Sequence, residues 1–418
     1  MKTPIKTKED FSELIKVITS ECQYKAPLAF GIARVDLGQL NPEKSLQATY
    51  PVVNWSENFG SAAVFISALQ DQGIEIDFSK NEVVYDINLD FIEYCLNAFN
   101  PFLDEATGSA HKNIQVISAI KEQMLTGFVE QGEFKVCFIF EDAPLESVEA
   151  TYLKLYAISL AKVGLRKINL NGAFGALPNV AWSEGIPIEL EYLRENEIML
   201  KVMDEYPHID FVDKFPRFLQ HIIPADNTRI LDTSKVRFGA QLAAGTTVMP
   251  GASYINFNAG TLGTVMVEGR ISSSAIVGAN SDVGGGASIL GVLSGTDGNP
   301  ISIGENCLLG ANSVCGIPLG NGCIIDAGLA ILEGTKIIIT EKELDKIHEV
   351  NLDWIPVDQL LNDDEELEQI DSENIFYIFK GSELQGLNGL HFRQNSTDGE
   401  IICKRSTKEV KLNEELHQ

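Results

Sequence analysis

The chain has 418 residues, of which 44% are hydrophobic, and a formal net charge of −27. This length accommodates two or three domains with ordinary cores, and the charge argues against wide contact with nucleic acid or anionic membranes, which depends on Lys and Arg. The first residues lack an apolar signal segment, and no stretch approaches the ~20 apolar residues of a membrane span. We therefore expect a cytoplasmic protein without nucleic-acid or membrane partners.

The first part of the chain, residues 1–225, predicts a mixed α/β domain. Apolar residues at helical spacing predict helices over residues 11–18 and 147–160. Strand-like runs lie at residues 28–35, 63–67, 83–87 and 134–140, and a shorter one at 167–170. No strong chemical motif occurs here, and a turn cluster at Pro224–Asn227 predicts the domain boundary.

A six-residue repeat predicts the fold of residues 226–340. Hydrophobic residues recur at every sixth position in several runs, with glycines near the corners that such a repeat requires. Short parallel strands that turn a corner every six residues form a triangular prism, so we predict a left-handed parallel β-helix. The alternative is an ordinary Gly-rich antiparallel sheet. The runs are Val236, Leu242, Val248 and Tyr254; Ile271, Val277, Val283 and Ile289; Ile303, Leu309 and Cys315; and Leu319, Ile325, Ile331 and Ile337.

The six-residue spacing is interrupted at residues 255–270 and 290–302. We expect both segments to form loops that leave the coil, where functional groups are commonly built. Beyond residue 340 the composition predicts a C-terminal segment, 341–418, with an acidic, partly helical insertion over 341–372 and a small β cap that contains a hairpin near Asp398-Gly399.

The seven cysteines are odd in number and include no CxxC pair, so reduced, buried thiols are expected instead of a disulfide framework or a zinc site. None of the six histidines lies in the repeat region, which argues against an imidazole base or imidazole zinc ligands there. A proton acceptor within the repeats would then have to be a carboxylate.

Glu268 is the strongest candidate because it lies two positions before Arg270, the single Lys or Arg between Phe238 and Glu333. An isolated cation in an acidic chain favours a ligand carboxylate or phosphate. The alternative is a Glu/Arg ion pair that braces a loop. The glycines at 284–286 and Gly291 allow backbone N–H groups to approach a ligand closely, so the group satisfies the requirements of acyl transfer.

A resemblance rests on six stretches of the chain: Ala243–Met249, Asn258–Gly263, Met266–Ile271, Ser281–Ile289, Cys307–Asn312 and Phe392–Ser396. These stretches resemble the long-form tetrahydrodipicolinate N-succinyltransferases of bacterial lysine and diaminopimelate synthesis. The similarity is strongest over residues 206–340 and 376–418, and the acidic segment 341–372 resembles an insertion.

The resemblance implies a homotrimer with active sites between subunits. It implies transfer of succinyl from succinyl-CoA, as a co-substrate and not a permanently bound cofactor, to the cyclic dicarboxylate tetrahydrodipicolinate. Glu268 matches the catalytic glutamate, acting as a base or as an acyl carrier, and Gly291 matches the glycine whose N–H binds the thioester oxyanion. The implied donor contacts are Arg270, Gly285, Ser288, Ala311, Asp326, Ala327, Gly334, Lys380, Arg393, Gln394, Asn395 and Ser396.

Three positions depart from the family pattern. Asp326 stands where Glu is familiar and Gln394 where Arg is, and the second change removes a cation from the donor contacts. Ser234 and Ala252 occupy the places of an acidic pair that holds magnesium in some relatives, so we expect no metal site. Two alternatives stay open at this stage: an acetyl-CoA version of the same reaction, and a non-catalytic β-helix assembly scaffold.

Overall fold

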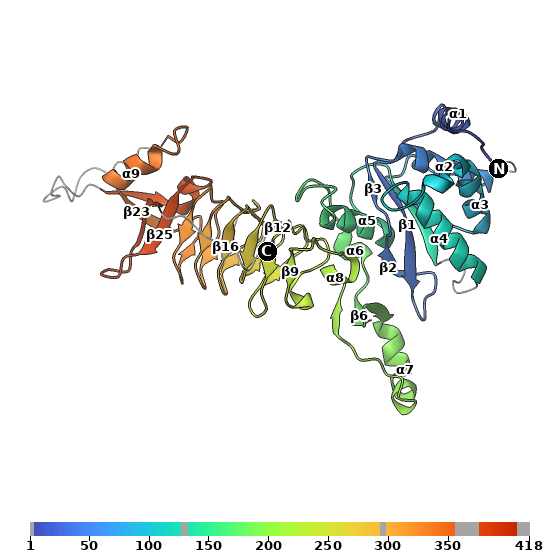
Figure 1. Cartoon of the computed structure of the whole chain (residues 1–418). Coiled ribbons are helices and arrows are strands. Elements are labelled where there is room, and N and C mark those ends of the chain that lie inside the picture. Colours follow the sequence, from blue (N-terminus) through green and yellow to red (C-terminus); the bar gives the residue numbers. More distant parts are fainter. Residues whose placement is uncertain (1–3, 127–132, 293–297, 356–375, 408–418) are drawn as a thin grey trace. The chain divides into compact units, whose positions relative to one another are not determined.

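The structure is a computed structural model that describes residues 4–126, 133–292, 298–355 and 376–407. The chain divides into two compact units, unit 1 (Met1–Pro216) and unit 2 (Arg217–Gln418). Unit 1 contains a sheet with covering helices, and unit 2 contains the repeat region (Figure 1).

The main sheet of unit 1 is antiparallel, with strand order β2-β1-β5-β4 and β3 paired beside β1. One hydrophobic core joins this sheet to three helices. Its buried aromatic side chains include Phe30 and Phe138 from the sheet and Phe65 and Phe91 from the helices. The elements are α1 (Lys8–Thr19), β1 (Ala29–Leu37), β2 (Ser45–Thr49), β3 (Asn54–Trp55), α2 (Phe59–Asp71), β4 (Glu82–Asp86), α3 (Leu89–Ala98), η1 (Asn100–Glu105), α4 (Lys112–Thr126) and β5 (Phe134–Ile139).

The rest of unit 1 is a buried helix and a small sheet. Every residue of α5 (Val148–Ser159) is buried, and this helix packs against β1 and β2. The small antiparallel sheet has the order β7-β6-β8, and helix α7 connects β7 to β8 along the chain. Its elements are α6 (Ala173–Ala176), β6 (Val180–Ser183), β7 (Ile186–Glu189), α7 (Leu190–Val202) and β8 (Phe211–Asp213).

Two sequence predictions in unit 1 are wrong. Residues 63–67 lie inside α2, not in a strand, because a helix whose sides are nearly all buried shows a continuous apolar run that periodicity cannot distinguish from a buried strand. Residues 167–170 form no strand. The predicted helices at 11–18 and 147–160 and the strands at 28–35, 83–87 and 134–140 are confirmed.

The repeat region of unit 2 winds around three stacks of parallel strands, which we call faces 1, 2 and 3. From β10 to β20, consecutive strands lie on faces 1, 2 and 3 in turn, so each complete coil in this part contributes one strand to each face. Face 1 holds β9 (Arg229–Ile230), β10 (Thr247–Val248), β13 (Val265–Val267), β16 (Ser281–Val283), β19 (Leu308–Leu309) and β21 (Ile324–Ile325); face 2 holds β11 (Tyr254–Ile255), β14 (Arg270–Ile271), β17 (Ser288–Ile289), β20 (Val314–Cys315) and β22 (Ala330–Ile331); face 3 holds β12 (Gly260–Thr261), β15 (Ile276–Val277) and β18 (Ser302–Ile303).

The predicted hydrophobic repeat supplies the interior of this coil. Val248, Ile271, Val277 and Ile289 are fully buried and lie at paired register positions on their faces. The exception is Tyr254, which is half-buried, because the corner before it has one extra residue and the inward position falls on Ile255. All strand pairs from β9 to β22 are parallel, so the antiparallel alternative is wrong.

The first predicted loop, residues 255–270, does not leave the coil. It contains β12 and β13, which pair in register with β15 and β16. The repeat is hidden in the sequence because the step from Val267 to Ile271 is two residues shorter than the usual step of six. In the second interruption, residues 290–292 and 298–301 lie in no strand, and residues 293–297 lie outside the described residues.

The cysteines are free, and all except the exposed Cys22 are buried. Cys307 and Cys323 occupy equivalent inward corner positions of successive coils. The Cys323 backbone N–H donates to Cys307 Sγ at 3.4 Å, and the Leu390 N–H donates to Cys323 Sγ at 3.4 Å. These thiols therefore help to satisfy backbone donors where the coils stack.

The C-terminal part adds strands to the end of face 1. β25 pairs in parallel with β21, so it continues the stack after a long connection, and it pairs antiparallel with β26. The acidic segment 341–372 is described only to residue 355 and begins with a helix; its remainder lies outside the described residues. The other elements of unit 2 are α8 (Phe218–His221), η2 (Thr233–Lys235), β23 (Lys336–Thr340), α9 (Glu341–His348), β24 (Phe376–Lys380), η3 (Gly381–Leu384), β25 (Leu390–Gln394) and β26 (Ile401–Arg405).

Gly260 tests the close stacking of the coils. A Cβ at this position would lie 1.8 Å from the Gln241 carbonyl oxygen, whereas a Cβ at Gly334 would meet no atom within 4 Å. We expect Gly260→Ala to lower the melting temperature by about 3–10 °C because it forces neighbouring coils apart. Gly334→Ala is the control and should leave it unchanged. Equal melting temperatures for both variants, measured by circular dichroism, would contradict this account of the stacking.

Candidate active site

The strand register of face 1 aligns five residues along one edge of the coil. Three of them are predicted site residues, and the other two directly precede predicted site residues. The inward residues of five successive strands pair in sequence, and the residue that follows each of them begins the corner between faces 1 and 2, which we call edge 1–2. Side chains at equivalent register positions of a parallel sheet lie in line. The row along edge 1–2 consists of Glu268, Gly284, Gly310, Asp326 and Arg393.

The next residue in four of these coils is also a predicted donor contact: Gly285, Ala311, Ala327 and Gln394. The backbone is tightly packed along this row. A Cβ at Gly284 would lie 2.6 Å from the Leu309 carbonyl oxygen, and a Cβ at Gly310 would lie 2.5 Å from the Ala327 nitrogen. Because these positions require glycine, much of edge 1–2 lacks large side chains that would block a bound ligand.

A cavity of about 400 Å³ opens beside Glu268. The Glu268 carboxylate is half-buried and has no hydrogen-bond or ion-pair partner among the described residues. Gly285 is close enough that a Cβ there would lie 3.5 Å from Glu268 Oε2. An unpaired carboxylate in a small cavity is suited to accept a proton from a bound amine. The cavity is lined by Met249, Pro250, Ala252, Glu268, Gly285, Gly286 and Asn312.

Sequence reasoning did not identify Met249, Pro250 and Asn312 as lining residues of this cavity. Gly286 has a φ of +73°, and a Cβ there would lie 2.4 Å from Asn312 Oδ1. Glycine at 286 thus fixes how closely the next coil approaches and where the Asn312 amide lies. No signal in a single sequence indicates which neighbouring coils would supply these residues.

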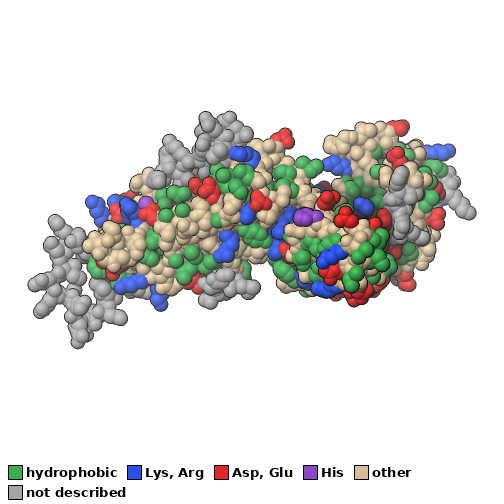
Figure 2. Space-filling model, turned by 90° about the horizontal axis from the view of Figure 1, so that it is seen from below, with side chains coloured by type: hydrophobic (Ala, Val, Ile, Leu, Met, Phe, Trp, Pro, Cys, Tyr) green, Lys and Arg blue, Asp and Glu red, His purple; other side chains and the backbone are tan. Residues whose placement is uncertain are grey.

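Arg270 lies on face 2 and is exposed. Its Nε and Nη2 donate hydrogen bonds to Ser288 Oγ at 3.1 and 2.7 Å, so the structure brings together these two predicted donor contacts. Within the described part of the chain Arg270 forms no ion pair with Glu268, and the loop-bracing alternative is therefore wrong. Figure 2 shows Lys, Arg, Asp and Glu side chains scattered among hydrophobic and uncharged groups on the visible face of the repeat region.

Gly291 lies away from Glu268. It follows β17 and begins the corner between faces 2 and 3, which we call edge 2–3, and a Cβ there would lie 3.1 Å from Ser272 Cβ. Its backbone N–H has no partner among the residues that the structure describes. The two predicted catalytic residues thus occupy different edges of the coil, with face 2 between them.

Two further predicted contacts lie near edge 2–3 of the last coil. Gly334 is exposed in the turn after β22, and Lys380 ends β24 directly opposite Lys336. The remaining predicted residues are at the hairpin that follows β25. The Gln394 amide donates to the Gly399 carbonyl at 3.1 Å, the Asn395 amide donates to Asp398 at 2.6 Å, and Ser396 is exposed.

Asp326 joins two residues of β25 at edge 1–2. Its Oδ1 lies 2.8 Å from His391 Nε2 and its Oδ2 accepts from Arg393 Nε at 2.9 Å. Burial would raise the pKa of Asp326, but the hydrogen bonds and positive charge of His391 and Arg393 outweigh it and hold that pKa below its usual value. His391 was not predicted; its position two residues before Arg393 in one strand was the available signal.

The residues that the structure describes include neither a metal-binding cluster nor a membrane-spanning helix. No group of three or more His, Cys, Asp or Glu among them is placed to hold a metal ion. Nor does any helix there combine the length and hydropathy needed to cross a membrane.

Three family models match the chain. They describe the N-terminal domain of tetrahydrodipicolinate N-succinyltransferase at residues 9–175, its middle domain at 177–217, and the hexapeptide repeat of succinyltransferases at 300–333. Together with the coil, these matches extend over both units.

Relatives with the name 2,3,4,5-tetrahydropyridine-2,6-dicarboxylate N-succinyltransferase align over nearly the full length. The protein from Sulfurimonas denitrificans is 67% identical over 99% of both chains, and that from Campylobacter jejuni is 57% identical over 99% of this chain and 100% of its own. A Campylobacter jejuni crystal structure of a putative 2,3,4,5-tetrahydropyridine-2-carboxylate N-succinyltransferase superposes with a TM-score of 0.88 at 56% identity, covering 97% of this chain and 100% of that one.

The Asp326 cluster should stabilise unit 2 in a pH-dependent manner. Because the folded-state pKa of Asp326 is lowered, its contribution is complete above the unfolded pKa near ~4 and is lost as the pH falls through the folded pKa. Asp326→Asn should lower the melting temperature at pH 7, and its difference from wild type should shrink below about pH 4. Asp353→Asn, at an exposed position, is the control. A difference that stays constant down to pH 3 would count against the cluster.

Proposed function

The chain belongs to the tetrahydrodipicolinate N-succinyltransferase family, and on that premise we propose that Glu268 is the catalytic residue of its reaction. The enzyme transfers a succinyl group from succinyl-CoA to the amine of tetrahydrodipicolinate, giving N-succinyl-2-amino-6-oxopimelate in diaminopimelate and lysine biosynthesis. The observation that carries the assignment is the unpaired Glu268 carboxylate in its cavity on edge 1–2.

In this proposal one water first hydrolyses the C=N bond of the cyclic acceptor, which gives the 6-oxo group and a free amine. The amine nitrogen then attacks the thioester carbonyl carbon, a C–N bond forms, and the C–S bond breaks. Glu268 takes the amine proton, which can then pass to the CoA thiolate as it leaves. A carboxylate without a competing partner is suited to this transfer, and a positioned base contributes about 10²–10⁴-fold to rate. The alternative role for Glu268, as a carboxylate that carries the acyl group as an anhydride, uses the same position.

The developing oxyanion needs a donor, and we assign this role to the backbone N–H of Gly291. Its N–H is free within the described residues, as an oxyanion donor requires. Since Glu268 and Gly291 lie on different edges of the repeat region, a complete site requires edge 1–2 of one chain to face edge 2–3 of another. This supports a homotrimer in which each site lies between neighbouring subunits.

The donor would extend along these facing edges. Arg270 and Ser288 present a fixed pair of polar groups on face 2 for an anionic substrate group. The row formed by Gly285, Ala311, Ala327 and Gln394 offers backbone and small side chains to the CoA chain, and Asp326 orients Arg393 at its end. Lys380, Gly334, Asn395 and Ser396 are the remaining proposed donor contacts.

We also propose finer features that the family membership supports. The coil is left-handed, as the resemblance to hexapeptide-repeat succinyltransferases implies. A crystal structure of this chain would test that handedness. The protein acts in the cytoplasm, where succinyl-CoA is its co-substrate and no cofactor stays bound. The C-terminal strands β24–β26 act as a cap on the coil.

Replacing the Glu268 carboxylate with an amide tests its role as proton acceptor. Glu268→Gln keeps the size of the side chain but cannot accept the amine proton, so kcat should fall by at least about 10²-fold. Thiol release from succinyl-CoA measures the rate, and an unchanged melting temperature would establish that the fold is intact. Near-normal turnover in a folded variant would disprove the assignment.

Subunit complementation tests whether each site is shared. Glu268→Gln removes the base, and Gly291→Pro removes the N–H donor, so each homotrimer should be inactive. When the two variants are co-expressed, some interfaces of mixed trimers contain both native groups, and activity should return to about a quarter to a third of wild type by random assembly. Absence of recovery in mixed trimers isolated with two affinity tags would show that the site does not combine residues of two chains.

A further inference from the structure

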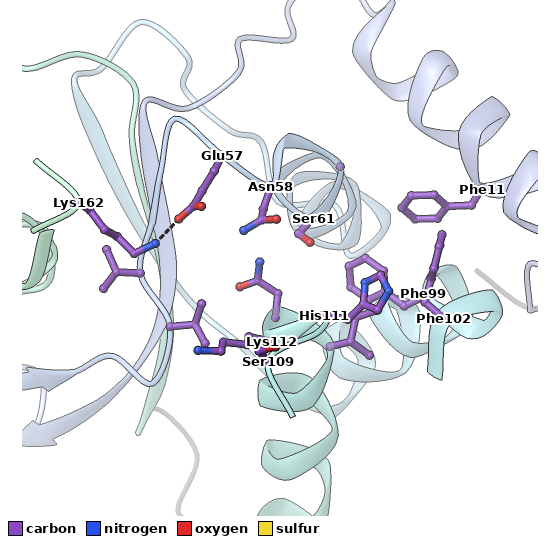
Figure 3. Close-up of a pocket in the computed structure, with 15 residues that line it drawn as sticks. Phe11, Glu57, Asn58, Ser61, Phe99, Phe102, Ser109, His111, Lys112 and Lys162 are labelled. Atoms are coloured by element: carbon purple, nitrogen blue, oxygen red, sulfur yellow. Dashed lines mark hydrogen bonds and ion pairs between the residues drawn. The ribbon is translucent and has the colours of Figure 1, made fainter. Parts of the chain in front are cut away.

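Unit 1 contains a second cavity of about 380 Å³, which the succinyl-transfer site does not use. It lies among α2, α4 and the residues around η1, and all of its lining residues belong to unit 1 (Figure 3). Its volume is within the range of small-molecule sites. The lining has one aromatic side and one polar side, and small-molecule pockets commonly combine an apolar wall with a few polar groups.

The aromatic side consists of Phe11, Phe99 and Phe102, which Figure 3 shows together on one side of the cavity. The ring of Phe11 lies 6.0 Å from that of Phe99 and 5.0 Å from that of Phe102, the latter edge to face. The His111 ring packs 5.2 Å from Phe102. These contacts hold the rings in place, so they form a rigid apolar wall.

The polar side is built on a buried amide network. Asn113 is 7% exposed and exchanges two hydrogen bonds of 3.0 Å with Asn54, while the Asn58 amide donates to Asn54 Oδ1 at 2.7 Å. Asn58 and Asn113 both line the cavity. The second N–H of the Asn113 amide has no partner among the described residues and is available to a ligand.

The charges around the cavity favour an anion. The Lys112 ammonium has no ion-pair partner in the part of the chain that the structure describes, whereas Lys162 is paired with Glu57, as Figure 3 shows. His111 lies 3.7 Å from Glu105. Lys112 is exposed and directly precedes the buried Asn113, so its ammonium group can reach a ligand at the mouth of the cavity. The first backbone N–H groups of α2 and α4, which also border the cavity, add to the positive potential.

We propose that this cavity binds a small carboxylate with a compact apolar body. The carboxylate accepts hydrogen bonds from Lys112 and the Asn113 amide, and the apolar body packs against Phe11, Phe99 and Phe102. An inorganic anion would leave the aromatic wall unused, and a neutral apolar molecule would leave the lysine and amides unpaired. Both groups of residues are thus explained by one ligand of this class.

Isothermal titration of the full-length protein with hexanoate tests the proposal. For a ligand of this size we expect a Kd of about 1 mM, and hexanamide, which lacks the charge, should bind about tenfold more weakly. Inorganic phosphate should not compete at equal concentration. No hexanoate binding, equal binding of hexanamide, or effective competition by phosphate would each overturn the proposal.

Variants locate the binding. Lys112→Gln should weaken hexanoate binding about tenfold, and Phe102→Ala should weaken it while leaving the preference for the carboxylate over the amide. Lys121→Gln, on the same helix α4 but outside the cavity, is the matched control and should bind as wild type does. Glu268→Gln should also bind hexanoate normally, so a failure here is separate from a failure of the catalytic assignment. Loss of binding in Lys121→Gln or retention in Lys112→Gln would place the ligand elsewhere.

Discussion

The arrangement of unit 2 depends on parallel strand register. Backbone hydrogen bonds between successive coils fix which residue lies over which, and the buried aliphatic residues keep that register because a shift by one position would turn them outward. The alignment of Glu268 with Asp326 and Arg393 follows from this constraint and needs no direct contact among them. Chemical groups far apart in sequence are therefore positioned by the stacking itself.

The corners contribute in a different way. Glycines at edge 1–2 let neighbouring backbones approach so closely that a side chain would be excluded, and the edge thus presents mainly peptide groups. The few side chains that project there, chiefly Glu268 at one end and Arg393 with Asp326 at the other, are correspondingly distinct in their surroundings. The faces supply a regular rigid frame and the corners supply the chemically distinct groups. This difference explains how a regular coil accommodates a specific reaction.

Much of this could be predicted from the sequence because the repeat has a period that few other structures share. The sequence indicates Glu268 and Arg270 because Arg270 is the single Lys or Arg in a long stretch and Glu268 lies two positions before it. In the structure Glu268 lines a cavity, whereas Arg270 is bonded to Ser288. What the sequence did not reveal depends on contacts between coils: the short step at Val267–Ile271 disguised two regular strands, and Asn312 enters the Glu268 cavity only through stacking. In unit 1, α2 was mistaken for a strand because burial on nearly all sides removes the helical period.

The row on edge 1–2 also behaves as a molecular ruler. Four coil-to-coil steps separate Glu268 from Arg393, and at the ordinary strand spacing they amount to roughly 19 Å. Adding or deleting a whole coil would preserve every local contact yet change that length by one increment of about 4.8 Å. The number of coils therefore sets how long a molecule must be to reach from one end of the row to the other. No individual residue encodes that number.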